Sequence, residues 1–423
     1  MTELPVAERF WTARPVLEHI REFARARRSG PWSTLLVVLA RAVASVEPNV
    51  MIPPTVGGSV SLNLFGALVG QSGAGKGASE GAGRDAVQFV DFNSRVIDLD
   101  ELPLGSGEGV ARTYRPAGTG DEEPNPRTRA LFSVPEVDTL TALGQRQGAT
   151  LMAELRKLYM GEQLGFNNAS KATCSVLPAH TYRASLLVGV QPAKAGPLLH
   201  DADGGTPQRF VFLRVDDPDA PDEPPPAPAP FVVKLPRWGS GPVNLTVPEI
   251  ARVAMDRHRV AILRGEDVDP LDGHRMLTQL KVAAALLILD GRTVIDDEDW
   301  RLAGFVIRES NRARTGIERT LAERTRAANR ARAEVKADEA DLLHDRAAQH
   351  LRNRARSAVL RRLGRAEASR KDLRSAMRND LRGDLDSTLA DLIDEGAVVE
   401  TAGVYVLVGE YGGTDCTPLR NSL

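Results

Sequence analysis

The chain has little cysteine and little net charge, and it has no long hydrophobic run. Of its 423 residues only Cys174 and Cys416 are cysteines, and because they match no metal-ligand spacing, a reduced environment is expected. The formal net charge of -2 means that any affinity for nucleic acid must come from local basic patches. The longest apolar stretch, Val282 to Leu289, is too short to cross a bilayer, and the first residues do not resemble a signal peptide. These absences predict a cytoplasmic protein with no membrane partner.

The composition that is present suits a folded chain with several domains. Charged residues make up 26% and hydrophobic residues 42%, which is typical of globular proteins. A chain of 423 residues is longer than one hydrophobic core usually serves, so two or three domains are expected. Apolar runs alternate with helical stretches between residues 55 and 216, a pattern that favours a mostly parallel sheet covered by helices. The strand-like runs are Leu62 to Val69, Ala130 to Val134, Ser185 to Val190 and Phe210 to Val215.

The rest of the chain divides by composition. A proline-rich stretch after Asp216 cannot form a regular hydrogen-bond ladder and predicts an extended linker. Residues 312–362 have almost no glycine or proline and predict a long exposed helix or helix pair, whose arginines either face solvent or touch DNA. The predicted regions are an N-terminal helical region (1–54), an ATPase core (55–216), the linker (217–244), a helical lid (245–325), a helical connector (326–357), a winged helix (358–410) and a tail (411–423).

The stretch from Gly70 to Lys76 follows the first apolar run and predicts a phosphate-binding loop. Glycines let successive N–H groups point inward, the following helix offers its positive end, and the lysine supplies a mobile charge for the outer phosphates of a nucleotide. Gly77 stands where this motif normally has the hydroxyl that binds Mg²⁺. The alternative is a flexible glycine-rich turn. The expected nucleotide contacts are Gly70, Gln71, Ser72, Gly73, Ala74, Gly75, Lys76, Gly77 and Ala78.

An NTPase also needs a carboxylate at the end of a neighbouring strand to hold Mg²⁺ and polarise water. The run Ala130 to Val134 is followed by Glu136 and Asp138, of which Glu136 is the better candidate. The strand-like run that ends at Val190 is followed by Gln191, an amide able to sense the γ-phosphate or to orient water. The alternative for Glu136 is an ordinary acidic loop after a strand. The alternative for Gln191 is a turn residue before a proline. ATP and Mg²⁺ are the cofactors that this set predicts.

The C-terminal region has the order of a winged helix. Short helical segments from Ala358 to Ile393 are followed by two strand-like runs ending at Leu407, and Ser369 is placed to cap a helix. A winged helix is used either for DNA contact, which we favour, or for protein contact only. The expected phosphate contacts are Arg370, Lys371 and Arg374, with Arg378 and Arg382 beside them.

Taken in order, these motifs resemble the AAA+ type replicative helicases of phages, plasmids and integrative elements. The chain is similar to superfamily 3 helicases and to the helicase half of primase-polymerase replication proteins. The resemblance covers roughly residues 10 to 320 and includes Gly204 to Phe210 and the helical run around Leu280 to Ala285. It implies an α/β fold: a P-loop AAA+ type core, which is a mostly parallel sheet flanked by helices, with a helical N-terminal region, a helical lid and a C-terminal winged helix.

The resemblance implies roles for single residues. Lys76 would hold the β- and γ-phosphates, Glu136 would activate water and Gln191 would act as a sensor. Arg209 would be an arginine finger that reaches the nucleotide of a neighbouring subunit. Of Arg275 and Lys281 on the lid, Lys281 is favoured as the nucleotide-sensing cation, since a lysine in an apolar helix is unfavourable unless it is paired or faces a ligand.

Such a helicase threads a single strand of DNA through a homo-oligomeric ring, expected to be hexameric. Pore-facing loops would then carry Arg146 and Lys171, unless these are ordinary solvated residues. Two departures weaken the metal site: Gly77 lacks a hydroxyl, and Pro135 stands where many such enzymes have an aspartate. One interpretation is that water or Ser79 completes the Mg²⁺ shell, and the other is that the protein binds nucleotide but hydrolyses it slowly. The leading hypothesis is an ATP-dependent DNA helicase or translocase, and the alternative is a nucleotide-binding initiator, loader or regulator that does not unwind DNA.

Overall fold

The computed structural model describes residues 6–114, 127–144, 150–166, 176–199, 205–266 and 274–409. Within them the chain divides into two compact units, Met1–Arg324 and Thr325–Leu423. No helix in these described ranges has both the length and the apolar character that are needed to cross a membrane.

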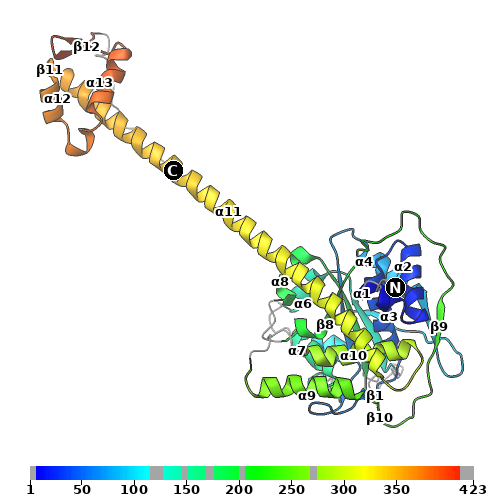
Figure 1. Ribbon diagram of the computed structural model, residues 1–423. Helices are drawn as coiled ribbons and strands as arrows, with labels where there is room; N and C mark the ends of the chain where they lie inside the picture. The colour runs from blue at the N-terminus through cyan, green and yellow to red at the C-terminus, as the bar shows by residue number, and fades with distance from the viewer. Residues whose placement is uncertain are drawn as a thin grey trace, which may run out of the picture. The chain divides into compact units, whose positions relative to one another are not determined.

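A five-stranded parallel sheet forms the centre of the first unit (Figure 1). Its order is β5 (Glu101–Pro103), β6 (Arg129–Val134), β7 (Arg183–Val190), β3 (Leu64–Val69) and β8 (Phe210–Arg214). Every neighbouring pair in it is parallel, so the carboxyl ends of all five strands lie along one edge. All residues of β3 and β7 are buried, as expected for a parallel sheet that is covered on both faces.

Helices cover the two faces of this sheet. Leu64 and Leu68 of β3 pack into one apolar cluster with helices of the N-terminal region, while Phe65 and Ala67 pack into the cluster on the other face. The first face is covered by α1 (Val6–Trp11), α2 (Pro15–Ala26), α3 (Pro31–Ala44), α4 (Lys76–Ala86) and α10 (Arg275–Leu289). The second is covered by α5 (Gly107–Tyr114), α6 (Val137–Gly144), α7 (Leu151–Met160) and α8 (Gly196–Leu199).

The segment 217–244, expected as an extended linker, contains two strands that pair with earlier strands of the first unit. After the last proline of the run, β9 (Phe231–Lys234) pairs in parallel with β4 (Val87–Val90). Further on, β10 (Val243–Asn244) pairs with β1 (Val50–Ile52), which also pairs with β2 (Val60–Ser61). The prolines prevent a ladder before Pro230, but Phe231, Val232 and Val233 have the β-branched and aromatic character of a strand.

The helical segment expected as a lid contains α9 (Glu249–Leu263), α10 and the start of α11 (Asp297–Leu363). From Thr278 to Leu289 every residue of α10 is buried, and the helix packs against α3 and α9 within the main core. The long helix that we expected over residues 312–362 is part of the single helix α11.

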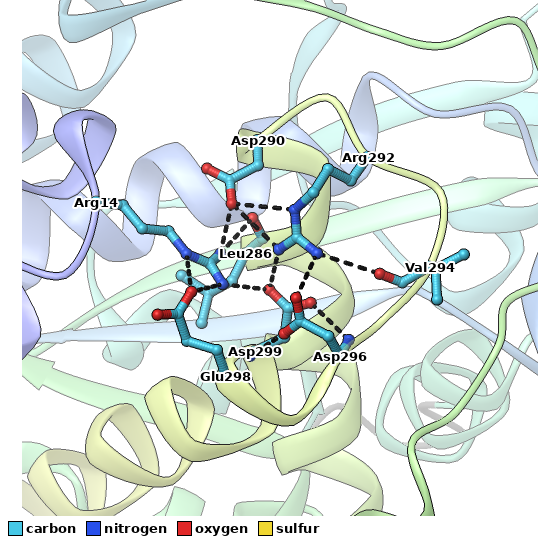
Figure 2. A network of polar contacts seen from close by, with 8 residues as sticks. All are labelled: Arg14, Leu286, Asp290, Arg292, Val294, Asp296, Glu298 and Asp299. Carbon is cyan, nitrogen blue, oxygen red and sulfur yellow. Dashed lines mark hydrogen bonds and ion pairs between the residues drawn. The ribbon is translucent and has the colours of Figure 1, made fainter.

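An ionic network joins the N-terminal helices to the turn between α10 and α11 (Figure 2). Arg14, only 6% exposed, lies 2.8 Å from carboxylate oxygens of Asp290, Glu298 and Asp299. Arg292 binds the fully buried Asp299 at 2.6 Å. Because two arginines share this buried carboxylate, the network holds the ends of three helices in one arrangement.

The second unit contains the end of α11, two further α-helices and a small sheet. Its elements are β11 (Ala368–Ser369), α12 (Arg370–Ala376), η4 (Asn379–Leu381), α13 (Leu385–Asp394), β12 (Val398–Thr401) and β13 (Val404–Leu407). The antiparallel sheet has the order β11-β13-β12, and the apolar side chains between the helices and the sheet form a separate core. Ser369 caps α12 in a capping box with Asp372, which confirms the predicted cap.

Candidate functional site

The loop after β3 requires glycine at three positions, for two different reasons. Gly73 and Gly75 have positive φ angles of 77° and 95°, in the left-handed region that only glycine adopts freely. A Cβ atom on Gly70 would lie 2.3 Å from Cγ2 of Val215, so no larger residue fits there. Helix α4 begins directly after this loop, with Gly75 as its N-cap residue. The backbone therefore turns sharply from the central strand into the positive end of a helix.

Lys76, the first residue of α4, folds back over the loop. Its Nζ donates hydrogen bonds to the carbonyl oxygens of Gly70 at 3.1 Å and Gln71 at 3.0 Å. Residues 71–74 and 77–78 are exposed. A phosphate group at this loop would meet exposed residues before the positive end of α4 and the ammonium of Lys76, which are the groups that the predicted phosphate-binding loop needs.

Ser79 does not supply the hydroxyl that Gly77 lacks. Its side chain is fully buried, and its Oγ lies 2.7 Å from Oγ of Ser33 and 3.1 Å from Oγ of Ser29. The same Oγ also donates to the carbonyl oxygen of Gly75 at 3.2 Å. This hydroxyl connects α4 to the N-terminal helices, so of the two expected ways to complete a Mg²⁺ shell, only water remains.

The acidic residues and the amide meet at the carboxyl edge of the sheet. Glu136 follows β6 and Gln191 follows β7, and Nε2 of Gln191 donates to Oε1 of Glu136 at 3.3 Å. Gly189 makes this approach possible, since a Cβ atom there would lie 2.0 Å from the carbonyl oxygen of Pro135 and 3.4 Å from Cδ of Lys76. The ends of β3, β7 and β6 are adjacent, so Lys76, Gln191 and Glu136 line one edge.

Lys194 is a residue of this site that the sequence did not reveal. It ends the short turn η1 (Pro192–Lys194), forms an ion pair with Asp138 in the first turn of α6, and lies 4.0 Å from Glu136. The hydrogen bond to Asp138 raises the pKa of Lys194. An ammonium thus lies beside both carboxylates that were expected to bind Mg²⁺. Its one sequence signal is its position three residues after Gln191.

Arg209 lies at the opposite edge of the sheet. It ends the turn η2 (Pro207–Arg209) directly before β8, whose first residue pairs with Phe65 near the start of β3. Since β3 is six residues long, the amino edge is about 20 Å from the loop. Within one chain, therefore, Arg209 does not reach the nucleotide loop.

Lys281 does not occupy the expected nucleotide-sensing position. Its side chain is fully buried, and its Nζ donates to the carbonyl oxygens of Asn63, at 2.9 Å, and Tyr159, whose ring centroid lies 3.4 Å from it. Asn63 precedes β3, so Lys281 lies at the amino edge, far from the loop. Burial lowers the pKa of Lys281, and the charges of Arg183 and Arg209 add to this effect. Arg275, the alternative lid cation, begins α10, whose first turns pack against η2 at this same edge.

The residues that were predicted to contact DNA lie in two parts of the chain. Arg146 and Lys171 lie outside the described residues. Arg370 begins α12, and its Nε binds Asp386 of α13 at 2.7 Å. Lys371 and Arg374 are exposed on α12.

The described core is a mixed α/β fold with a five-stranded parallel sheet flanked by helices, which is consistent with a Rossmann-like or P-loop-like core. Neither the models of known protein families nor curated proteins match this chain. Among the described residues, no group of three or more histidine, cysteine, aspartate or glutamate side chains is placed to hold a metal ion.

Proposed function

We propose that this protein is a P-loop nucleoside triphosphatase that binds ATP at the carboxyl edge of its sheet. The observation that carries the proposal is the position of Lys76, Gln191 and Glu136 at the ends of three adjacent parallel strands. Phosphoryl transfer needs a phosphate cradle and a group that orients water a few ångströms away, and this edge offers both.

In the proposed mechanism the side chains at this edge divide the tasks between them. Lys76 leaves the carbonyl oxygens of Gly70 and Gln71 to bind the outer phosphates, where it offsets the charge that develops during transfer. Glu136 accepts a hydrogen bond from the attacking water, and Gln191 holds the carboxylate in place. A bound Mg²⁺ would supply further positive charge on the phosphates, with Glu136, Asp138 and water as its ligands.

We further propose that the protein acts on DNA as a ring-shaped helicase or translocase in the replication of a mobile element. The order of its motifs supports this. Arg209 lies at the sheet edge opposite the loop, so in a ring it would act on the site of a second copy, after leaving the carbonyl oxygen of Gly205 to which it donates. The order of helices and strands in the second unit supports a winged helix. The prediction of a helical lid is supported only by the position of this segment in the chain, because α10 packs within the main apolar core.

A second candidate function is nucleotide binding without rapid hydrolysis, as in an initiator, loader or regulator. Two observations favour it: the Ser79 hydroxyl is turned into the core, and Lys194 is bound to Asp138 beside Glu136. Both features weaken the binding of Mg²⁺, on which hydrolysis depends.

The test is phosphate release from ATP and Mg²⁺ with and without single-stranded DNA. We expect turnover that rises with DNA in the wild type and falls at least a hundredfold in Lys76→Ala, the scale seen when a transition-state charge contact is removed. Lys234→Ala removes an exposed lysine from β9 and serves as the charge-matched control. Nucleotide binding without phosphate release would favour the second candidate function. A wild-type chain that neither binds ATP nor releases phosphate would refute the proposal.

A further inference from the structure

Charge in the second unit is segregated along the chain. Residues 346–382, which form the last turns of α11, then α12 and η4, contain twelve lysines and arginines and three acidic residues. Residues 383–408, which form α13 and the strands β12 and β13, contain six acidic residues and no lysine, arginine or histidine. A winged helix that used α13 and the hairpin to read DNA would bring these acidic residues against phosphates. The charge distribution therefore disfavours that docking mode.

A pocket lies within the basic segment, between α11 and the α12–η4 segment. Its volume is about 300 Å³, and its polar lining consists of hydrogen-bond donors: Asn353, Arg354, Ser357, Arg361 and Arg378. Asp380 lies 3.1 Å from Arg354 and 3.5 Å from Arg378, so one carboxylate is shared by two guanidinium groups. Three arginines against one carboxylate leave the pocket with excess positive charge.

A second pocket beside α11 is lined by both basic and acidic side chains. It has a volume of about 440 Å³, and Asp391 and Glu395 of the α13 segment face Arg352 and Arg356 of α11 across it. Glu395 pairs with Arg356 at 2.6 Å. The arginines of this pocket are thus balanced by acidic residues, whereas those of the first pocket are in excess.

The donors on α11 are spaced along one side of the helix. Arg354, Ser357 and Arg361 follow the i, i+3, i+7 pattern of a single helix face. Arg354 and Arg361 are separated by about 10 Å along the axis at 1.5 Å per residue, so they can contact different phosphates of one strand.

We propose that the second unit binds the sugar-phosphate backbone of DNA through this pocket, with Arg361 and Arg378 as the principal contacts, and that α13, β12 and β13 face away from the DNA. Asp380 positions Arg354 and Arg378. The inference rests on the proposed action on DNA and specifies the surface that performs it. It replaces the groove-reading role of the last helix of a winged helix with a phosphate clamp, which binds without reading sequence.

The experiment measures binding of the full chain to fluorescent single-stranded and duplex DNA at several salt concentrations. Each phosphate contact contributes about 0.7 to 0.9 to the slope of log K against log salt. The double variant Arg361→Ala, Arg378→Ala should therefore lower the slope by about 1.4 to 1.8 and weaken binding to all sequences alike. Arg361→Lys should keep the slope, because it keeps the charge.

Two control variants separate the possible outcomes. Arg352→Ala removes an exposed arginine of α11 from the acid-lined pocket and should leave the slope unchanged, and so should Asp394→Asn on α13. The proposal is overturned if the double variant, with a wild-type melting temperature, binds as the wild type does, or if Asp394→Asn strengthens binding several-fold. A wild-type chain that binds no DNA at all would refute both this inference and the proposed function, whereas normal binding by the double variant refutes the inference alone.

Discussion

Lys194 shows how one side chain changes the chemistry expected of the site. Its ammonium lies beside Asp138 and Glu136, the two carboxylates available to Mg²⁺. A monovalent cation at this position competes with the metal, and the hydrogen bond that raises the pKa of Lys194 keeps it charged. Under the proposed function, the Mg²⁺ dependence of hydrolysis should therefore depend on Lys194 as well as on the two acidic residues.

The first residue-scale prediction is that Lys194→Ala lowers the Mg²⁺ concentration needed for half-maximal hydrolysis. We expect a shift of about two- to fivefold, the range of an exposed ion pair. The measurement is a Mg²⁺ titration of phosphate release at saturating ATP. Lys234→Ala, which removes an exposed lysine of β9 that donates to Ser94 away from the site, is the control. A variant that loses affinity for ATP itself would show instead that Lys194 binds phosphate.

The second residue-scale prediction concerns His274, at the start of α10. Burial, together with the charges of Arg209 and Lys281, lowers the pKa of His274 to about 4. Because the folded pKa is below the unfolded value of about 6.5, the stabilisation is present above pH 6.5 and is lost as the pH falls toward 4. Between pH 7.5 and pH 5 the free energy of unfolding should fall by about 2 kcal/mol through this group.

Urea unfolding at the two pH values, in the wild type and in His274→Gln, measures this effect. The variant has no titrating imidazole, so its loss of stability between pH 7.5 and pH 5 should be smaller by the same amount. Equal pH dependence in the two proteins would show that the pKa of His274 is the same in the folded and the unfolded chain.

At the scale of elements, the ionic network of Figure 2 fixes how the N-terminal helices pack against α10 and α11. Arg14 lies in the turn between α1 and α2, and its acidic partners lie at the end of α10 and the start of α11. Burial raises the pKa of Asp299, and hydrogen bonds from Arg292 and other groups oppose this shift. Removing one arginine therefore leaves a buried carboxylate with fewer partners, which is strongly unfavourable.

We predict that Arg14→Ala destabilises the first unit by about 3 kcal/mol and that Arg14→Lys recovers only part of this, because lysine cannot reproduce the planar guanidinium. Tryptophan fluorescence during denaturant unfolding is the measurement, since Trp11, Trp32, Trp238 and Trp300 all belong to this unit. Arg301→Ala removes an exposed ion pair with Asp297 and should change stability by less than about 0.5 kcal/mol. A loss in Arg14→Ala no larger than this control would mean that the network adds nothing to stability.

At the scale of the whole molecule, the proposed ring would use the two edges of each copy's sheet for different tasks. The loop with Lys76 lies at the carboxyl edge and Arg209 at the amino edge, about 20 Å apart for a six-residue strand. If Arg209 completes the site of a neighbouring copy, each chain contributes its loop to one site and its Arg209 to another. One chain alone then has no complete site.

The prediction is that Lys76→Ala and Arg209→Ala are each inactive but recover partial ATP hydrolysis when mixed. A mixed assembly places an intact loop beside an intact arginine. The matched control is a mixture of Lys76→Ala and Glu136→Gln, which should stay inactive because both residues belong to the same edge of one chain. An Arg209→Ala protein that melts normally and hydrolyses ATP at the wild-type rate would exclude the arginine-finger role.

The sequence alone determined the local features of this protein. The glycines at 73 and 75, the lysine that opens α4 and the serine cap of α12 all depend on neighbours within a few residues, so their patterns predicted the local structure directly. The run of apolar strands with polar residues at their ends likewise predicted a parallel sheet with Glu136 and Gln191 at one edge.

The tertiary structure decided which polar groups stay accessible, because burial depends on segments that are distant in the chain. Ser79 is turned toward Ser29 and Ser33, some 50 residues earlier, and Lys281 toward the carbonyl of Asn63, more than 200 residues earlier. The segment 217–244 pairs with β4 and β1, and Lys194 lies beside two carboxylates from the segment that follows the neighbouring strand β6. Short-range patterns fix backbone conformation, whereas the partner of a buried or bridging charge is set only when distant elements pack.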